Sequence, residues 1–261
     1  MPDLNPISLW RRLMAAPNDS RGKTLVMAFI VSGIAALAVS GAHSVLGPKI
    51  GANRSAEAQA KLDAMIASVP GLSDILGENG GSLDAVVIDL ASGNMSDIDA
   101  AIFDPTAVPK IAIPPDTDIA GLGTIPAEER IYLVRDGGDV SLVVLPVSGA
   151  GYQGVIKGFL ALEGDFNTVA ALTITEQSET PGLGAKITED AWQAKWPGTE
   201  LMTPDGEIRV AVKQGGSTNE YEVDGITGAT RTGNGVSNMI RFWVGPNGYG
   251  PFLETLKESG L

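Results

Sequence analysis

The chain has 261 residues, a formal net charge of −13 and no cysteine. The lack of cysteine excludes disulfides, thiolate nucleophiles and Cys-ligated metal centres, and one histidine alone excludes multi-histidine metal sites. The acidic charge argues against nucleic-acid binding, because Lys and Arg must neutralise the backbone phosphates. Any redox chemistry in this chain therefore needs an organic cofactor.

The first predicted element is a membrane-spanning helix over residues 24–48. This segment contains no Asp, Glu or Arg, and no Lys. Its apolar run Leu25–Leu46 would form a helix of about 33 Å, enough to cross a hydrocarbon core of about 30 Å. A cleaved signal peptide is the alternative, which the length of the run disfavours.

The charges around this span predict its orientation. Residues 1–23 hold four basic residues against two acids, whereas residues 24–261 hold 14 against 29. By the positive-inside tendency, residues 1–23 form a cytoplasmic N-terminus and residues 49–261 an exported, periplasmic domain. The chain is thus expected to be a single-pass protein of a bacterial inner membrane.

The segment after the span begins with a predicted linker helix, Ala56–Val69. Its apolar residues recur at helical spacing, and Pro70-Gly71 would end it. A strand is predicted over Asp84–Leu90, and the proline-rich stretch Asp104–Asp118 is predicted to be a loop or an edge segment.

Two hairpins follow and predict an antiparallel sheet. The first joins Ile131–Arg135 to Val140–Val147 through the turn sequence Asp-Gly-Gly-Asp, and the second joins Val155–Leu162 to Val169–Ile174. A short helix over Ala191–Trp196, a strand over Ile208–Val212 and a helix over Val236–Val244 complete the pattern. The predicted fold class is α+β, as one domain after one transmembrane helix.

Two stretches are candidates for a binding site, Glu179–Gly184 and Asp224–Thr230. By composition alone both are also typical of ordinary turns. In the second stretch, glycines allow the backbone to approach a ligand, and hydroxyl groups can bind a phosphate. The amides of the helix that follows would favour the same anion. These glycines and threonines are Gly225, Gly228, Thr227, Thr230 and Thr232.

The residue order of Asp224–Thr230 resembles the motif of proteins that carry FMN in a phosphoester linkage to threonine. This resemblance implies that Thr230 accepts the FMN phosphoryl group from FAD, through a separate exported flavin transferase. Asp224 and Gly225 would belong to the stretch that the transferase recognises. Thr227, Gly228 and Ala229 would fix the geometry of the acceptor.

The wider chain is similar to the C-subunit family of sodium-translocating NADH:quinone oxidoreductases. The similarity rests on the order and spacing of Phe159–Glu163, Asn167–Val169, Asn234–Val236, Phe242-Trp243 and Gly248–Leu253. It implies a membrane-anchored electron carrier that works with other membrane subunits of one respiratory complex, with ion pumping a property of the assembly. One departure is visible at Gly151–Val155, where the family pattern Gly-x-Gly-Leu-Trp lacks its tryptophan.

The resemblance also implies that the loop Glu179–Gly184 meets the flavin ring. Leu183 would pack on the ring face, and backbone groups of the loop, which includes Thr180 and Gly182, would bind its polar edge. Glu179 is either a carboxylate within reach of the flavin or a capping or surface acid. Three tryptophans, Trp192, Trp196 and Trp243, are expected in the core.

Two alternatives remain at this point. The first is the homologous G subunit of an Rnf-type electron-transport complex, which shares the anchor, the FMN domain and the threonine motif. The second is a non-redox flavin-binding interaction module. In each case the chain alone carries no complete active site, and no residue is assigned a catalytic or metal-binding role.

Overall fold

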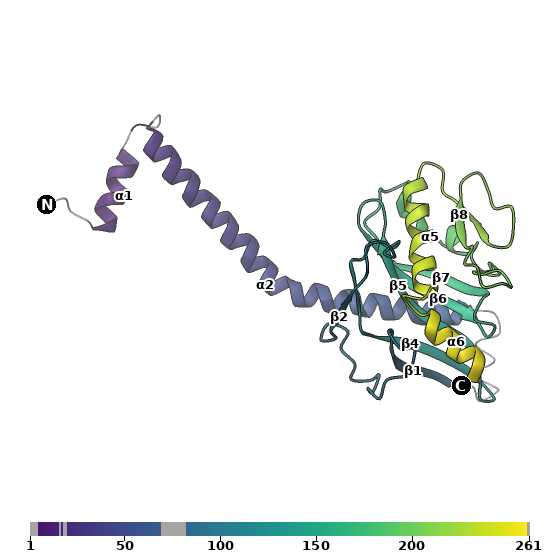
Figure 1. Ribbon diagram of the computed structural model, residues 1–261. Helices are drawn as coiled ribbons and strands as arrows, with labels where there is room; N and C mark the ends of the chain where they lie inside the picture. Colours follow the sequence, from purple (N-terminus) through teal and green to yellow (C-terminus); the bar gives the residue numbers. More distant parts are fainter. Residues whose placement is uncertain (1–4, 16, 18–19, 69–81, 260–261) are drawn as a thin grey trace. The chain divides into compact units, whose positions relative to one another are not determined.

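The computed structural model describes residues 5–15, 17, 20–68 and 82–259, which Figure 1 shows with their elements labelled. The chain divides into two compact units, residues 1–57 and 58–261.

The N-terminal elements are helix α1, Pro6–Ala15, and the long helix α2, Arg21–Ser68. Residues Arg21–Gly41 of α2 have a mean hydropathy of 2.1 and are long and apolar enough to cross a membrane. The sequence analysis expected a span and a separate linker helix. The structure instead has one helix that continues through Pro48, and the predicted end of the linker at Pro70-Gly71 lies outside the described residues.

The second unit is built on a five-stranded antiparallel sheet with the order β1-β4-β5-β6-β7. Its strands are β1 Ser82–Asp89, β4 Glu128–Asp136, β5 Asp139–Ala150, β6 Val155–Glu163 and β7 Val169–Glu176. Both predicted hairpins are confirmed, as β4–β5 and β6–β7. Together with the helices below, this sheet confirms the α+β fold class.

Smaller elements surround the sheet. They are the antiparallel pair β2 Lys110–Ala112 and β3 Thr124–Pro126, the 3-10 helix η1 Gly184–Thr188, the short helix α4 Asp190–Gln193, the parallel pair β8 Ala211–Lys213 and β9 Glu222–Asp224, and the helices α5 Thr230–Val244 and α6 Gly250–Ser259. The strand expected over Ile208–Val212 is thus shifted toward the C-terminus, because Ile208 forms an isolated bridge with Met202 instead.

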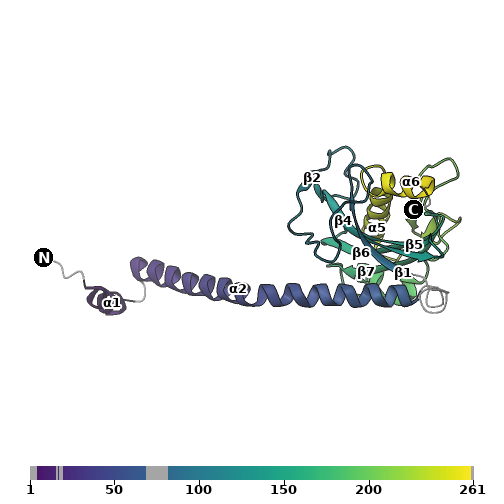
Figure 2. The ribbon, with the colours of Figure 1, turned by 90° about the horizontal axis from the view of Figure 1, so that it is seen from below.

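The main core lies between the sheet and α5 and α6, which lie on one side of it in Figure 2. Side chains alternate across each strand, so the strands supply apolar residues to both faces. One face contributes Leu133, Leu145 and Leu160 to the main core. The other face carries a smaller buried cluster around Val134 and Val144.

Helix α5 begins six residues earlier than the sequence predicts, at Thr230 rather than Val236. The glycines that argued against a helix there are required by packing. A Cβ atom on Gly235 would lie 2.6 Å from the carbonyl oxygen of Ala150, and one on Gly233 would lie 3.0 Å from a methyl group of Val212. The first distance is too short for a Cβ atom and the second is very tight, so glycine lets α5 lie close against β5 and β8. The predicted attachment residue is consequently the first residue of the helix.

Candidate functional site

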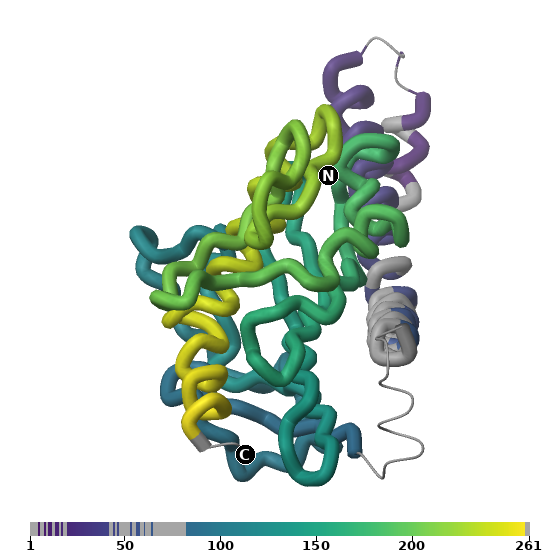
Figure 3. Tube along the Cα trace, turned by 90° about the vertical axis from the view of Figure 1, so that its right-hand side faces the viewer, coloured from purple at the N-terminus to yellow at the C-terminus, as the bar shows by residue number. Residues whose placement is uncertain are grey.

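The two candidate stretches meet at the start of α5. A Cβ atom on Gly228 would lie 3.2 Å from a methyl group of Leu183, so these two loops touch. A Cβ atom on Gly184 would collide with the side chains of Thr232 and Glu179. In Figure 3 the green and yellow-green segments that contain the loops gather at one end of the domain, and α6, in yellow, lies toward the other.

Thr230 is exposed at the first position of α5. The residue before it, Ala229, is buried and has φ −122° and ψ 38°, and no side-chain hydrogen bond caps the helix there. Amides of the first helical turn have no partner within a helix, so they favour an anion in front of them. The exposed Thr230 hydroxyl therefore lies at a point suited to a phosphoester.

The turn that leads into Thr230 depends on glycine. Gly228 has φ +80°, and the amide of Ala229 donates to the carbonyl oxygen of Ile226 at 3.0 Å. Gly225 donates its amide to the carbonyl oxygen of Lys213 at 2.8 Å. Thr227 is exposed. These contacts hold the backbone of the motif while its threonine hydroxyls remain accessible.

Glu179 is 4% exposed, so it is not a surface acid. One carboxylate oxygen accepts the amides of Tyr152 and Gln153, both at 2.9 Å, and the other accepts the hydroxyl of Thr232. The carboxylate thus joins the β5–β6 turn to the first turn of α5. Thr232 is itself buried. Its hydroxyl donates to Glu179, whereas the sequence suggested that it would bind a phosphate.

The rest of this loop presents an open surface. Gly182 has φ +74° and no atom within 4 Å of a Cβ placed on it, and Leu183 is 44% exposed. The Thr180 carbonyl oxygen accepts the amide of Leu183 at 3.1 Å, which fixes the turn. Exposed Tyr152 lies on the neighbouring β5–β6 turn. An accessible hydroxyl, free amides and an exposed apolar residue beside them fit the phosphate and the planar ring of FMN.

The carboxylate of Asp224, at the end of β9, binds a backbone amide and a lysine. It accepts the amide of Ser217 at 2.6 Å and pairs with the ammonium group of Lys195 at 3.1 Å. These contacts lower the pKa of Asp224 to about 2, with the Ser217 hydrogen bond as the largest cause. Its backbone oxygen accepts the indole N–H of Trp192 at 2.9 Å. Asp224 thereby fixes the entry to the motif.

Arg231 and Tyr152 had no role that could be assigned from the sequence. The guanidinium carbon of Arg231 lies 5.3 Å from the centre of the Tyr152 ring, a cation–π contact. The position of Arg231 next to the motif was visible in the sequence, but its partner comes from a distant turn. The three tryptophans expected in the core are buried there, as Trp192, Trp196 and Trp243.

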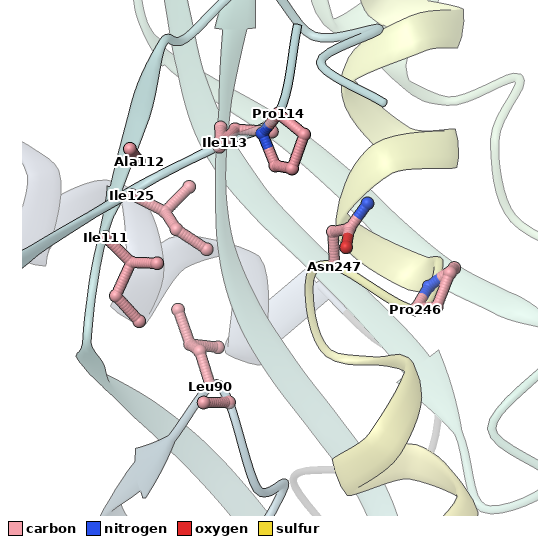
Figure 4. Close-up of a pocket in the computed structure, with 9 residues that line it drawn as sticks. Leu90, Ile111, Ala112, Ile113, Pro114, Ile125, Pro246 and Asn247 are labelled. Atoms are coloured by element: carbon pink, nitrogen blue, oxygen red, sulfur yellow. The ribbon is translucent and has the colours of Figure 1, made fainter. Parts of the chain in front are cut away.

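A cavity of about 220 Å³ lies elsewhere, beneath the β2–β3 pair and the α5–α6 connection (Figure 4). The side chains that line it are apolar except for Asn247. None of the predicted site residues lines it, and it has no titratable group in its wall. It therefore contributes nothing to the site at Thr230.

The chain is similar to proteins of a known family over most of its length. Residues 151–245 match the family described as FMN-binding domain. The chain is 35% identical to the C subunit of the Na(+)-translocating NADH-quinone reductase of Yersinia pestis, over 94% of this chain and 96% of that protein. It is 34% identical to the corresponding protein of Pseudomonas aeruginosa, over 94% and 99%. The crystal structure of Shewanella oneidensis NqrC covers 78% of this chain and all of that chain, with a TM-score of 0.66 and 31% identity.

Proposed function

Because this chain belongs to the C-subunit family of Na(+)-translocating NADH-quinone reductases, we propose that it is an electron carrier with FMN bound covalently to Thr230. It is a flavoprotein subunit of an NADH-quinone reductase complex, anchored by α2. The names of these relatives favour this assignment over the G subunit of an Rnf-type complex.

One observation carries the attachment to Thr230. Thr230 is exposed at a helix start whose N-cap makes no side-chain hydrogen bond, two residues after Gly228, which lies against Leu183 of the open loop. A bound FMN would supply an isoalloxazine ring that accepts and releases electrons. Three parts of the chain would hold it. Thr230 would bond to the phosphate, the amides at the start of α5 would stabilise the negative charge of that phosphate, and the 179–184 loop would pack on one face of the ring.

The attachment is a phosphoryl transfer. The Thr230 oxygen bonds to the FMN phosphorus of FAD, AMP leaves, and the hydroxyl proton passes to a base on the flavin transferase. The exposure of Thr230 and Thr227 supports access by such a protein. We place this domain in the periplasm, since basic residues precede α2 and an acidic domain follows it. The other membrane subunits of the complex would then deliver and remove the electrons.

The test is production of the full chain with and without its flavin transferase. Intact mass should rise by one FMN, and the protein band should fluoresce, only when the transferase is present. Thr230→Ala should abolish both signals, and Thr106→Ala, at an exposed threonine outside the motif, should retain them. A wild-type chain that stays unmodified, or a Thr230→Ala chain that is modified, would refute this proposal.

A further inference from the structure

We propose that Arg231 is the counter-charge of the phosphoester on Thr230, and that Tyr152 holds its guanidinium group in place. This inference rests on the proposed function, since it requires a phosphate at Thr230. It adds a binding residue outside the Asp224–Thr230 motif.

The position of Arg231 is unfavourable for a cation unless an anion lies nearby. Arg231 is the second residue of α5, where the partial positive charge of the helix start opposes a positive side chain. Throughout the part of the chain that the structure describes, no carboxylate pairs with Arg231. Its contact is the ring of Tyr152. A phosphate on the preceding residue would supply the charge that this cation lacks.

The packing of α5 on β5 explains why Arg231 meets Tyr152. A Cβ atom on Gly149 would lie 2.7 Å from Met239, and one on Gly235 would lie 2.6 Å from the carbonyl oxygen of Ala150. Met239, Gly235 and Arg231 are spaced four residues apart, so they share one face of the helix. The face that packs along β5 thus ends with Arg231 at the β5–β6 turn.

The turn that carries Tyr152 is also fixed. The buried carboxylate of Glu179 accepts the amides of Tyr152 and Gln153. The Gln153 side chain donates to the Thr180 hydroxyl at 3.3 Å, which ties the turn to the loop beside Thr230. Both partners of the cation–π contact therefore have anchored backbones. A guanidinium held this way loses little conformational entropy when it binds a phosphate.

The proposal predicts that one substitution has different effects in the two forms of the protein. In the unmodified chain, Arg231→Leu removes an unfavourable cation from a helix start together with its contact to the Tyr152 ring, so the melting temperature should change little. In the FMN-loaded chain the same change removes the partner of the phosphate, so it should lower the melting temperature by about 1–4 °C. This loss should shrink at high salt, and Arg231→Lys should restore part of it.

Arg209 provides a matched control. Its guanidinium carbon lies 6.0 Å from the Tyr221 ring centre, and its backbone oxygen accepts a hydrogen bond from Arg241 in the last turn of α5. Arg209→Leu therefore removes a similar ring contact, together with an exposed pair to Glu207, at the opposite end of the helix. Its effect on the melting temperature should be the same in the loaded and unmodified forms.

The experiment uses the full chain in detergent, made with and without the transferase. Unfolding followed by near-ultraviolet circular dichroism of the tryptophans gives the melting temperatures, and the ³¹P resonance of the loaded protein reports on the phosphate. Arg231→Leu should shift that resonance, Tyr152→Leu should shift it less, and Arg209→Leu should leave it unchanged. An unchanged resonance with equal thermal effects in both forms would overturn the role of Arg231 alone. A wild type without bound phosphate would overturn the proposed function and this inference together.

Discussion

Two carboxylates hold the loops on either side of Thr230, and they do so in different surroundings. Glu179 is 4% exposed and accepts three hydrogen bonds from neutral donors. The Asp224 side chain is 41% exposed and combines a backbone amide with a lysine. The difference shows that the first turn of α5, after Thr230, is held by a buried carboxylate, whereas the segment before Thr230 is held by an exposed one.

The two carboxylates are expected to contribute differently to the free energy of unfolding. Removing a buried acceptor leaves its donors without partners, at a cost of about 1–3 kcal/mol each, because water cannot replace it. An exposed ion pair contributes little to stability, since water and salt screen it. We therefore expect the stability of the site to depend on Glu179 far more than on Asp224.

The largest effect is expected from Glu179→Leu. The substitution leaves the amides of Tyr152 and Gln153 and the hydroxyl of Thr232 without an acceptor, which should cost about 3–5 kcal/mol. Thermal unfolding of the full chain should show a fall in melting temperature of about 10 °C. Attachment of FMN should fall as well, because the first turn of α5 loses its contact with the β5–β6 turn.

Glu179→Gln is the sharper control for this prediction. Glutamine keeps the shape and one acceptor oxygen for the two amides, and its NH₂ group can donate to Thr232. Its melting temperature should lie near that of the wild type, as should that of Glu207→Gln, an exposed acid 3.9 Å from Arg209. Equal losses for the Leu and Gln variants of Glu179 would contradict the account based on hydrogen bonds.

The fold could be predicted from the sequence where the pattern is local. The hairpins β4–β5 and β6–β7 follow from apolar runs separated by short turns, so neighbours in sequence are neighbours in space. The strand β9 and its parallel pairing with β8 were missed, because β9 has three residues and its partner lies across a loop. The start of α5 was misplaced because Gly233 and Gly235 are unfavourable for a helix until their packing partners are known.

The candidate site could also be predicted only where its residues are close in sequence. The stretch Asp224–Thr230 is contiguous, so its order could be recognised. The environment of Glu179 could not be predicted, because its donors lie 26 to 53 residues away along the chain. The contact of Arg231 with Tyr152 has the same origin, since it depends on how α5 lies along β5.

Thr232→Val tests the buried carboxylate from its other side. Valine has nearly the same shape and helix propensity as threonine, so the change isolates the lost hydroxyl. It leaves one oxygen of Glu179 without a donor and should cost about 1–2 kcal/mol, or about 4 °C in melting temperature. Thr227→Val, at an exposed threonine of the motif, should have little effect. If Thr227→Val lowered the melting temperature more than Thr232→Val, the hydrogen bond between Thr232 and Glu179 would not be the main source of the stability lost.

Asp224→Asn should give the smallest effect, and one that depends on pH. The pKa of Asp224 is lowered from 3.8 to about 2 in the folded chain, so its carboxylate stabilises the fold fully above pH about 4. As the pH falls toward 2, the folded state also takes up the proton and this contribution disappears. The difference in melting temperature between wild type and Asp224→Asn should therefore be constant from pH 7 to 4 and shrink below. Asparagine can still accept the Ser217 amide but cannot pair with Lys195, so Lys195→Gln should reproduce the part of the effect that comes from the ion pair. A difference that persists unchanged at pH 2 would show that the charge of Asp224 is not its source.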